Sequence, residues 1–378
     1  MKLAIVTTHP IQYNAPWFKM LAEQNGIDVK VFYTWEQSIK SPKYDPGFGK
    51  VIEWDIPLLD GYEYTFVKNV SDSPGSHHYK GIDNPTLNEE VSAWGAEAVL
   101  VIGWPFKSHL SCMKYFKCKI PVLFRGDSTL LNERSGIKKV IRRISLRYIY
   151  SNVDYALYVG TNNKEYFLAH GLKEKQLVFV PHAIDNKRFF DIDGNYELMA
   201  NEWRRELGID DSNVVLLYAG KFDKVKNPSY ILDIAEQMTD EKYRFILVGN
   251  GPLEKELKER SENDHRVMFV DFQNQQKMPV VYRLADYFVL SSNSETWGLG
   301  VNEALASGRR VITNSNVGCA VDMIKENNGI IVNPGDVNDV MIYVGNSAGQ
   351  PITKDILETY SFDTLVSNLT TLIKTLKS

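Results

Sequence analysis

Two glutamates eight positions apart, Glu295 and Glu303, mark the part of this 378-residue chain whose residue types and spacing best suit chemistry. Glu295 follows an apolar run, Tyr287–Leu290, that is typical of a buried strand. Glu303 lies in an Ala/Leu-rich segment that favours a helix, with Gly298 and Gly300 where that helix would begin. Backbone N–H groups at a helix N-terminus hold anions, and Glu303 would lie about two turns further along. The spacing therefore suits the pyrophosphate of a nucleotide sugar.

The same stretch resembles the E-x7-E signature of retaining GT-B glycosyltransferases of the family 4 (glycosyl transferases group 1) type. The resemblance implies that Glu295 binds sugar hydroxyls and that Glu303 binds the ribose of the donor. An ordinary solvated helix start, with acidic residues in its first turns, is the alternative interpretation. The donor-binding residues implied between the two acids are Trp297, Gly298, Leu299 and Gly300.

A second match to this family lies where another apolar run ends at Gly220, followed by the cations Lys221 and Lys226. The family places Arg or Lys at the first position and Lys at the second, and both bind the donor diphosphate. Fixed cations stabilise a leaving diphosphate more strongly in the transition state than in the ground state. Lysine at the first position lacks the bidentate fork of arginine but keeps its charge. Lys224 is a weaker third candidate, and solvated loop lysines are the alternative.

Two further loops match the donor-binding domain of the family. Gly249 and Asn250 follow a strand-like run and precede a helix-like stretch, where the family has a loop beside the donor. Phe272 and Gln273 follow the next strand-like run, in the loop that carries the nucleotide base in the family. Base contacts there usually come from the backbone, so the side chains of this loop do not identify the base. As the donor, a UDP-sugar is favoured over a GDP-sugar. Asp286 is expected to terminate its helix rather than contact the ligand.

Polar and aromatic residues follow the first predicted strand, where many family members have a glycine-rich loop. In a doubly wound sheet, the loops at the carboxyl ends of the strands line the ligand crevice. For the histidine of this loop, a strand-end side chain bonded to backbone is an equal alternative. The candidates for sugar or acceptor contacts are His9, Gln12, Tyr13 and Asn14.

Three more acceptor candidates, Trp104, Arg125 and Asp127, come from the ends of later strands. The indole of Trp104 could stack on a sugar face, whereas Arg125 and Asp127 suit acceptor hydroxyls. A structural ion pair between the last two is the alternative. The family's histidine near the reacting carbon is not at its expected place, because His109 comes a few residues later, on a predicted helix.

No metal site is predicted. His77 and His78 are adjacent and so point in different directions, no acid completes a site, and both are assigned to an acceptor loop, Ser71–Gly81. The cysteines match no metal spacing, are too few for a disulfide framework and fit a reducing cytoplasm. They are Cys112, Cys118 and Cys319.

The composition excludes other classes of protein. A net charge of −4 argues against a general nucleic-acid binder, and 44% hydrophobic with 24% charged residues is typical of a soluble globular chain. The first apolar run is too short for a signal peptide and ends at His9-Pro10, so we expect it to be a core strand. No segment approaches the length needed to span a bilayer, so any membrane contact is expected to be peripheral.

Short apolar runs alternate with helix-like stretches, and the alternation restarts in the second half of the chain. This pattern predicts an α/β fold of two doubly wound units with parallel sheets. The predicted strands are Leu3–Thr8, Asp28–Tyr33, Ala98–Ile102, Pro121–Phe124, Tyr155–Val159, Leu177–Val180, Val214–Ala219, Arg244–Val248, Val267–Val270, Tyr287–Leu290, Arg310–Thr313 and Ile330–Val332.

The join between the units is predicted at Pro181–Asp185, which resembles the family's interdomain linker P-N-G-V-D. We expect an acceptor-binding domain at 1–184 and a donor-binding domain at 185–360. The GT-B resemblance implies that they face a central cleft and that a helix at 361–378 crosses back to the first domain. Leucines recur at helical spacing in that tail: Leu365, Leu369, Leu372 and Leu376.

The resemblance implies a retaining hexosyltransferase that needs no cofactor or metal ion and acts by front-face displacement. The acceptor would be a glycan, or a lipid-linked or protein-linked glycan, in bacterial surface polysaccharide or glycan assembly. A GT-B sugar-nucleotide epimerase and a non-catalytic two-domain sugar-binding protein are the alternatives. The residues expected to be catalytic are Lys221, Lys226, Glu295 and Asp127.

A basic segment at 137–149 predicts weak attachment to the inner face of the cell membrane. Its apolar residues recur at helical spacing, so we expect them to pack on the sheet while the basic residues face outward. An ordinary solvated basic face is the alternative. The basic residues are Lys138, Lys139, Arg142, Arg143 and Arg147, and the apolar ones are Ile137, Val140, Ile141, Ile144 and Tyr148.

Overall fold

The computed structural model describes residues 1–36, 43–45, 50–52, 55–133, 135–347 and 355–377. The chain forms two compact α/β units, each with its own parallel sheet. Unit 1 comprises residues 1–43, 57–182 and 362–378, and unit 2 comprises residues 44–56 and 183–361. The expectation of two doubly wound sheets is therefore confirmed.

Unit 1 is built on a seven-stranded sheet in the order β5-β2-β1-β6-β7-β8-β9, in which every pair is parallel. The strand order reverses between β1 and β6, so the loops after these two strands flank the switch point. The strands are β1 (Lys2–Thr7), β2 (Asp28–Tyr33), β5 (Glu63–Phe66), β6 (Ala98–Ile102), β7 (Val122–Arg125), β8 (Tyr155–Tyr158) and β9 (Leu177–Phe179).

Apolar strand residues form the centre of unit 1, because both faces of a parallel sheet are covered by helices. Leu3, Ile5, Leu100 and Leu123 are all fully buried. The helices are α1 (Ala15–Ala22), α2 (Leu87–Ala93), α3 (Lys107–Phe116), α4 (Ile137–Tyr150), α5 (Thr161–Ala169) and α15 (Phe362–Lys377), with short 3-10 turns at Tyr79–Gly81 and Glu174–Gln176.

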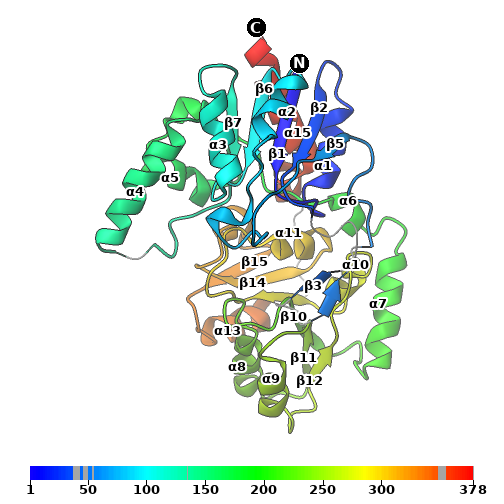
Figure 1. Ribbon diagram of the computed structural model, residues 1–378. Coiled ribbons are helices and arrows are strands. Elements are labelled where there is room, and N and C mark those ends of the chain that lie inside the picture. The colour runs from blue at the N-terminus through cyan, green and yellow to red at the C-terminus, as the bar shows by residue number, and fades with distance from the viewer. Residues whose placement is uncertain (37–42, 46–49, 53–54, 134, 348–354, 378) are drawn as a thin grey trace. The chain divides into compact units, whose positions relative to one another are not determined.

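The C-terminal helix α15 belongs to unit 1, as predicted. It contacts α1 and β9, and Figure 1 shows this red helix among the blue elements of the N-terminal region. Leu365, Leu369 and Leu372 of the predicted stripe are buried. The side-chain amide of Asn368 also donates a hydrogen bond to the Phe179 carbonyl at 3.0 Å. The helix is therefore held by both its apolar stripe and a polar contact.

Unit 2 repeats the architecture with a six-stranded sheet in the order β12-β11-β10-β13-β14-β15. Every pair is again parallel, and the order reverses between β10 and β13. The loops after β10 and β13 therefore flank its switch point. The strands are β10 (Val214–Ala219), β11 (Tyr243–Val248), β12 (Val267–Val270), β13 (Tyr287–Leu290), β14 (Arg310–Asn314) and β15 (Gly329–Val332).

Helices of unit 2 alternate with these strands. The elements are α6 (Asn186–Phe189), α7 (Asn195–Glu206), α8 (Ser229–Gln237), α9 (Glu254–Arg260), α10 (Met278–Arg283), α11 (Leu299–Ala306), α12 (Ala320–Met323), α13 (Asn338–Ser347) and α14 (Asp355–Thr359). Within the described ranges, no helix is both long enough and apolar enough to cross a bilayer.

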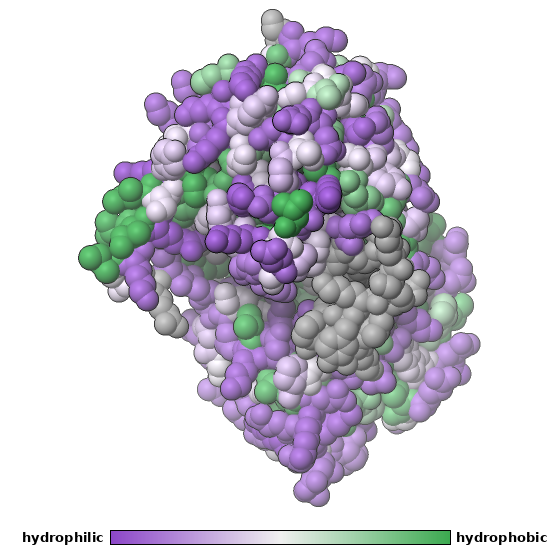
Figure 2. All heavy atoms as spheres, in the orientation of Figure 1, coloured by the Kyte–Doolittle hydropathy of each residue, from purple (hydrophilic) through white to green (hydrophobic). Residues whose placement is uncertain are grey.

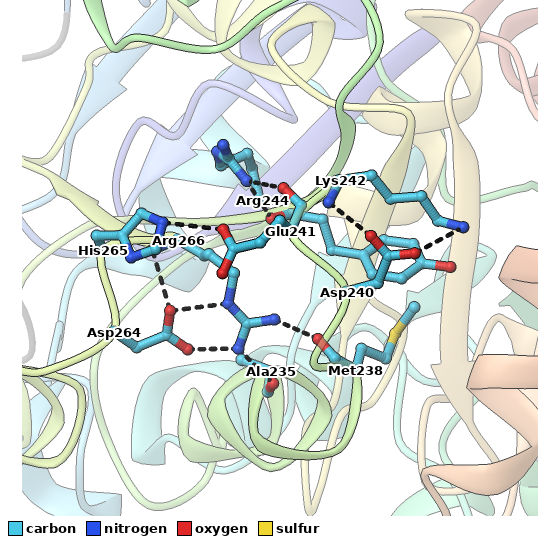
Figure 3. Close-up of polar contacts among 10 residues, drawn as sticks. Ala235, Met238, Asp240, Glu241, Lys242, Arg244, Asp264, His265 and Arg266 are labelled. Carbon is cyan, nitrogen blue, oxygen red and sulfur yellow. Dashed lines mark hydrogen bonds and ion pairs between the residues drawn. The ribbon is translucent and has the colours of Figure 1, made fainter.

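Charged groups stabilise the amino-terminal edge of this second sheet (Figure 3). Arg266 donates from its guanidinium to the carbonyl oxygens of Ala235, at 2.9 Å, and of Met238. The same guanidinium pairs with Asp264 at 2.6 Å. Arg266 therefore joins the end of α8 to the start of β12, at the edge opposite the switch-point loops.

A short segment from the first third of the chain contributes to unit 2. Strands β3 (Lys43–Asp45) and β4 (Lys50–Ile52) form a two-stranded sheet. The backbone N–H of Gln276 donates to an Asp55 carboxylate oxygen at 3.1 Å, and its side-chain amide donates to the Asp55 carbonyl at 2.6 Å. These contacts tie Asp55 to unit 2, to which it belongs.

One packing prediction for unit 1 is wrong. We expected the apolar residues of α4 to pack on the sheet, but Ile137, Val140, Ile141, Ile144 and Tyr148 are 56–76% exposed. The helix instead buries Leu146 and Tyr150. The helical period was identified correctly, but a second, shorter apolar face supplies the contacts with the core.

Candidate active site

The loops after β10 and β13 are tied to each other at the switch point of unit 2. The backbone N–H of Asn293 donates to the Val225 carbonyl at 2.8 Å, and its side-chain amide donates to the Lys224 carbonyl at 2.8 Å. The Ser291 hydroxyl donates to the Asn227 carbonyl, also at 2.8 Å. These bonds fix the lysine-bearing loop against the loop that carries the first glutamate.

Lys226 and Glu295, one from each loop, form an ion pair. The Ser292 hydroxyl donates to the same carboxylate oxygen, Oε2, at 3.3 Å. The backbone of Glu295 is also held, because Gly318 donates its N–H to the Glu295 carbonyl at 3.0 Å. The Lys226 side chain is 32% exposed and that of Glu295 15% exposed, so both charges remain accessible to a ligand.

Lys221 lies at the start of the same lysine loop and is half-buried. The Tyr218 hydroxyl donates to the Lys221 carbonyl at 2.7 Å, which fixes the backbone at this point. Burial raises the pKa of Tyr218 well above its ordinary value, with contributions from Asp223 and Glu295, so this hydroxyl keeps its proton. The Lys226 N–H in turn donates to the Asp223 carboxylate at 2.8 Å.

Gly298 begins α11, with a φ of 102° that favours glycine. A Cβ here would lie 2.9 Å from a Leu290 methyl carbon and 3.0 Å from a Val317 methyl carbon. A Cβ on Gly300 would approach the Phe288 ring at 3.1 Å. The two glycines therefore let the first turn of α11 lie directly on β13, with Leu299 half-buried between them.

Trp297 lies beneath this turn rather than on the surface. Its side chain is 3% exposed, and its indole N–H donates to the Asn302 side-chain oxygen at 3.0 Å. The indole ring also lies 5.3 Å from the Tyr360 ring, centroid to centroid. Trp297 therefore supports the glycine turn from inside, whereas the resemblance implies that this residue belongs to the donor-binding set.

The second acid of the motif, Glu303, is nearly completely buried in α11, at 3% exposure. The hydroxyl of Tyr282, on α10, donates to Glu303 Oε2 at 2.7 Å. This contact orients the carboxylate and satisfies one of its oxygens, as a buried acid requires. The motif did not reveal Tyr282, because this tyrosine lies on another helix, twenty-one residues before Glu303.

The loop after β11, which carries the predicted donor residues Gly249 and Asn250, packs against the lysine loop. A Cβ on Gly249 would lie 2.0 Å from the Gly220 carbonyl oxygen, so only glycine fits this approach. The buried Asn250 amide donates to Asp271 at 3.0 Å and to Glu254 at 2.9 Å, and its oxygen accepts the N–H of Phe272 at 3.0 Å.

Asn250 therefore shapes the predicted base loop through its side chain. Within that loop, Phe272 and Gln273 are half-buried. The Gln273 amide donates to the Asp271 carbonyl at 2.9 Å. Asp286 accepts the N–H of Val215 at 2.8 Å, and this structural role agrees with the expectation that it does not contact ligand.

In unit 1, the loop after β1 carries the predicted polar residues at the switch point. His9 Nδ1 lies 3.0 Å from the Thr8 hydroxyl, and its ring lies 5.4 Å from the Trp35 ring. Asn14 is buried and accepts the indole N–H of Trp17 at 3.3 Å. Gln12 and Tyr13 are half-buried. Asn14 thus organises the loop around the start of α1.

Arg125 is buried at the end of β7. Its guanidinium donates to the carbonyl oxygens of Val180 at 2.6 Å and Pro181 at 2.9 Å. Burial lowers its pKa to about 10, and the charge of Asp127 partly offsets this effect. The Arg125 side chain therefore holds the segment after β9 in place, and the predicted acceptor contact does not fit this arrangement.

Asp127 differs from Arg125 because its side chain is 45% exposed, and one carboxylate oxygen lies 3.8 Å from His182 Nε2. Burial lowers the pKa of His182, while the nearby carboxylate of Asp127 opposes that shift. Sequence reasoning missed His182, although it lies inside the predicted linker segment. Trp104 is half-buried and packs against the core of unit 1.

His109 is fully buried on α3, away from solvent. Its Nδ1 lies 2.7 Å from the Gly103 carbonyl and its Nε2 lies 3.0 Å from the Thr34 hydroxyl. Burial lowers its pKa to about 4.

His77 and His78 are exposed, and His78 Nε2 lies 3.0 Å from the Ser73 carbonyl. Across the described ranges, no group of three or more His, Cys, Asp or Glu residues could hold a metal ion.

Part of this chain resembles known glycosyltransferases in sequence. Residues 199–343, which carry both lysines and both glutamates of the predicted donor site, match the family model described as glycosyl transferases group 1. An uncharacterized glycosyltransferase of Methanocaldococcus jannaschii is 27% identical over 279 residues, which are 68% of this chain and 70% of that protein. The alpha-monoglucosyldiacylglycerol synthase of Streptococcus pneumoniae is 33% identical over 122 residues, 30% of this chain and only 27% of its own length.

Solved structures match nearly the whole chain at low identity. The Anabaena protein HepE, in complex with UDP and glucose, has a TM-score of 0.67 at 13% identity and covers 99% of both chains. The UDP-GlcNAc 2-epimerase of M. jannaschii has a TM-score of 0.63 at 15% identity, again over 99% of both chains. The fold is therefore that of the GT-B glycosyltransferases. Over residues 199–343 the chain is therefore similar to the glycosyl transferases group 1, and the relative that it matches over most of its length is named a glycosyltransferase.

Proposed function

We propose that this protein transfers a sugar from a nucleoside-diphosphate sugar, with UDP as the favoured nucleotide, to a hydroxyl group of a glycan acceptor with retention of configuration. The observation that carries the proposal is the Lys226–Glu295 pair beside the glycine start of α11. A cation for the diphosphate and an acid for the sugar thus lie at one switch point. UDP is favoured by analogy with HepE, which is similar in fold and whose structure holds UDP.

In the proposed reaction, the bond from the anomeric carbon to the diphosphate oxygen breaks while a bond to the acceptor oxygen forms on the same face. The acceptor proton passes to the leaving phosphate oxygen. Lys221, Lys226 and the backbone N–H groups at Gly298–Gly300 stabilise the charge that develops on the diphosphate. Glu295 binds the sugar hydroxyls, Glu303 binds the ribose, and no metal ion or cofactor takes part.

Unit 2 would bind the donor through these groups, and unit 1 would bind the acceptor. Asp127, which is exposed and lies near His182, is the best-placed acceptor group after β7, and the loop carrying His9, Gln12 and Tyr13 is a second contact. The acceptor proposed is a glycan or a lipid- or protein-linked glycan of bacterial surface polysaccharide assembly, at the inner face of the cell membrane. The family resemblance alone supports this acceptor class.

A GT-B sugar-nucleotide epimerase is the second candidate, and the similarity in fold to the UDP-GlcNAc 2-epimerase is the observation that favours it. An epimerase makes product from the donor alone, whereas a transferase needs an acceptor hydroxyl. Incubation with the donor in the absence of acceptor therefore separates the two activities. A non-catalytic sugar-binding protein is a weaker candidate, because binding alone does not need lysines at the diphosphate position.

The test is a thermal-shift screen across UDP- and GDP-sugars, followed by kinetics with the best donor. Binding to the native state raises the melting temperature by mass action. We expect Glu303→Ala to weaken donor binding and Lys221→Ala to slow turnover at least ~10-fold, as expected for loss of a charged transition-state contact. Wild-type kinetics in both variants would reject the donor site, and product formed without acceptor would reject transfer in favour of epimerisation.

A further inference from the structure

Helix α4 of unit 1 presents an apolar stripe to solvent. Its five members are exposed by 76%, 56%, 58%, 65% and 62%, in the order Ile137, Val140, Ile141, Ile144 and Tyr148. Figure 2 shows the corresponding green patch at the left, over the position of α4 in Figure 1. We call these five residues the α4 stripe.

The outward direction of the α4 stripe follows from the helical period. With 3.6 residues per turn, the five positions fall within about a third of the helix circumference. The two buried residues, Leu146 and Tyr150, lie on the opposite side, and Ile149 packs partly against the core next to them. The helix is thus anchored by one narrow face while its larger apolar face is unpaired with the core of unit 1.

Basic residues border the α4 stripe on both sides. Lys138 lies along one edge and Arg147 along the other, and both are exposed. The segment 137–150 contains five basic residues and no acidic residue, although the whole chain has a net charge of −4. Lys114 of α3 adds a further cation, with its Nζ 5.1 Å from the centre of the Tyr148 ring.

Two of the five helix cations are partly compensated. Lys139 pairs with Glu133 at 2.7 Å, and Arg143 lies 3.5 Å from the same carboxylate. These two residues lie toward the core side of the helix, and so does Arg142, whose guanidinium donates to the Tyr166 hydroxyl at 3.3 Å. The cations nearest to the α4 stripe therefore retain their charge for an external partner, and the paired ones help to hold the helix in this orientation.

We propose that α4 binds the surface of an anionic lipid bilayer, with the α4 stripe inserted among the headgroups and the bordering cations on lipid phosphates. An outward apolar face flanked by Lys and Arg is the pattern of helices that lie in the plane of a membrane interface. Neighbouring large exposed apolar residues of this kind are unusual on a protein surface without a partner. The structure thus adds apolar insertion to the electrostatic contact that the sequence predicts.

The charge of this surface distinguishes a bilayer from a second copy of the chain. In a symmetric dimer formed through α4, the same basic residues of both copies would face one another and repel. An anionic bilayer supplies the opposite charge to every cation around the stripe, each worth about 5-fold in affinity near such a surface. Because vesicle binding needs neither donor nor acceptor, its measurement does not depend on the proposed glycosyl transfer.

The experiment is co-sedimentation of the full chain with vesicles of phosphatidylcholine and phosphatidylglycerol, compared with vesicles of phosphatidylcholine alone. The stripe variant is Ile141→Ser with Ile144→Ser. The matched control is Leu198→Ser with Ile342→Ser, because these residues are 63% and 62% exposed on helices of unit 2. The charge variant is Lys138→Ser with Arg147→Ser. All six positions are exposed, so a melting curve should confirm that each variant folds.

We expect binding to the anionic vesicles only, weakened at least ~10-fold in both the stripe and the charge variants and unchanged in the control. Added salt should weaken the binding of the wild type, because surface charges are screened. No binding of the wild type to anionic vesicles at low salt would overturn the proposal. Binding of the stripe variant as strong as that of the wild type would also overturn it, because only an electrostatic contact would then remain. Self-association without vesicles that is abolished in the stripe variant would overturn it in favour of a second copy.

Discussion

The Tyr282 hydroxyl donates to Glu303 Oε2 at 2.7 Å, so an aromatic residue of α10 fixes the second acid of the predicted donor motif. Both side chains are buried, at 2% and 3% exposure. A buried carboxylate needs such donors to remain in one orientation. Tyr282 is therefore a positioning residue for the group proposed to bind ribose.

Replacing Tyr282 with Phe should weaken UDP binding roughly 10-fold, because the hydrogen bond that orients the buried Glu303 carboxyl group is lost. The variant should also discriminate less between UDP and its 2′,3′-dideoxy analogue than the wild type does. Isothermal titration with both nucleotides measures the two effects. Tyr287→Phe is the control, since that hydroxyl contacts Ser347 at 2.9 Å instead. Undiminished ribose discrimination in Tyr282→Phe would contradict the positioning role.

Lys226→Met should lower the affinity for UDP at least ~10-fold, because a fixed cation at the diphosphate is removed. Lys164→Met is a matched control, since Lys164 is 34% exposed against 32% for Lys226 and pairs with Glu174 at 2.9 Å. Both variants should change the free energy of unfolding by less than about 1 kcal/mol, as partly exposed ion pairs do. Equal affinities for UDP in the two variants would remove Lys226 from the donor site.

Gly298→Ala should destabilise the protein by about 1–3 kcal/mol, through backbone strain and the crowding of Leu290 and Val317. Gly308→Ala, at the other end of α11, separates these causes. Gly308 also has a positive φ, 74°, but a Cβ there meets nothing within 4 Å. Chemical denaturation should therefore give a clearly larger loss for Gly298→Ala. Equal losses would mean that strain alone, and not contact with β13, determines the requirement for glycine.

Acidification should destabilise unit 1 through His109. Its pKa is lowered to about 4 by burial, and an unfolded histidine has a pKa near 6.5, so the unfolded state binds the proton first. The stability contributed by the neutral ring is complete above about pH 6.5 and is lost as the pH falls to about 4, by at most roughly 3 kcal/mol. In unfolding curves across this range, His109→Gln should show a shallower pH dependence, and an unchanged slope would argue against this linkage.

Transferase activity should persist in EDTA, because lysines rather than a metal ion are proposed to neutralise the diphosphate. The assay compares the rate with the best donor before and after chelation. The control is readdition of manganese or magnesium to the chelated enzyme, which should change the rate little. Complete loss of activity in EDTA, with recovery on adding metal, would contradict the proposed mechanism.

The two sheets could be predicted because buried parallel strands are continuous apolar runs, and these stand out against polar loops. Edge strand β5 was not predicted, since Glu63–Phe66 has only four residues and two of them are exposed. Helix α7 was not predicted either, because its only buried residue is Ala200. Elements with little apolar burial leave little pattern in the sequence.

Side-chain direction limited the prediction of the site. The resemblance assigned Lys226 and Glu295 separately to one donor site, and the ion pair shows that the two side chains lie together. The same reasoning could not foresee that Trp297 and Arg125 turn inward, because their partners, Asn302 and the carbonyls of the segment after β9, are set by tertiary packing. The outward stripe of α4 has the same cause, since a helical period does not reveal which face meets the core.

The place of α15 in unit 1 has a consequence for biosynthesis. The ribosome releases residues 362–377 only after the whole of unit 2 has been made, yet these residues contact α1 and β9. Until then, the nascent first unit lacks the cover of Leu365, Leu369 and Leu372, which are buried in the finished protein. A chain interrupted after unit 2 would leave that apolar surface open, so completion of unit 1 depends on a helix that is translated after unit 2.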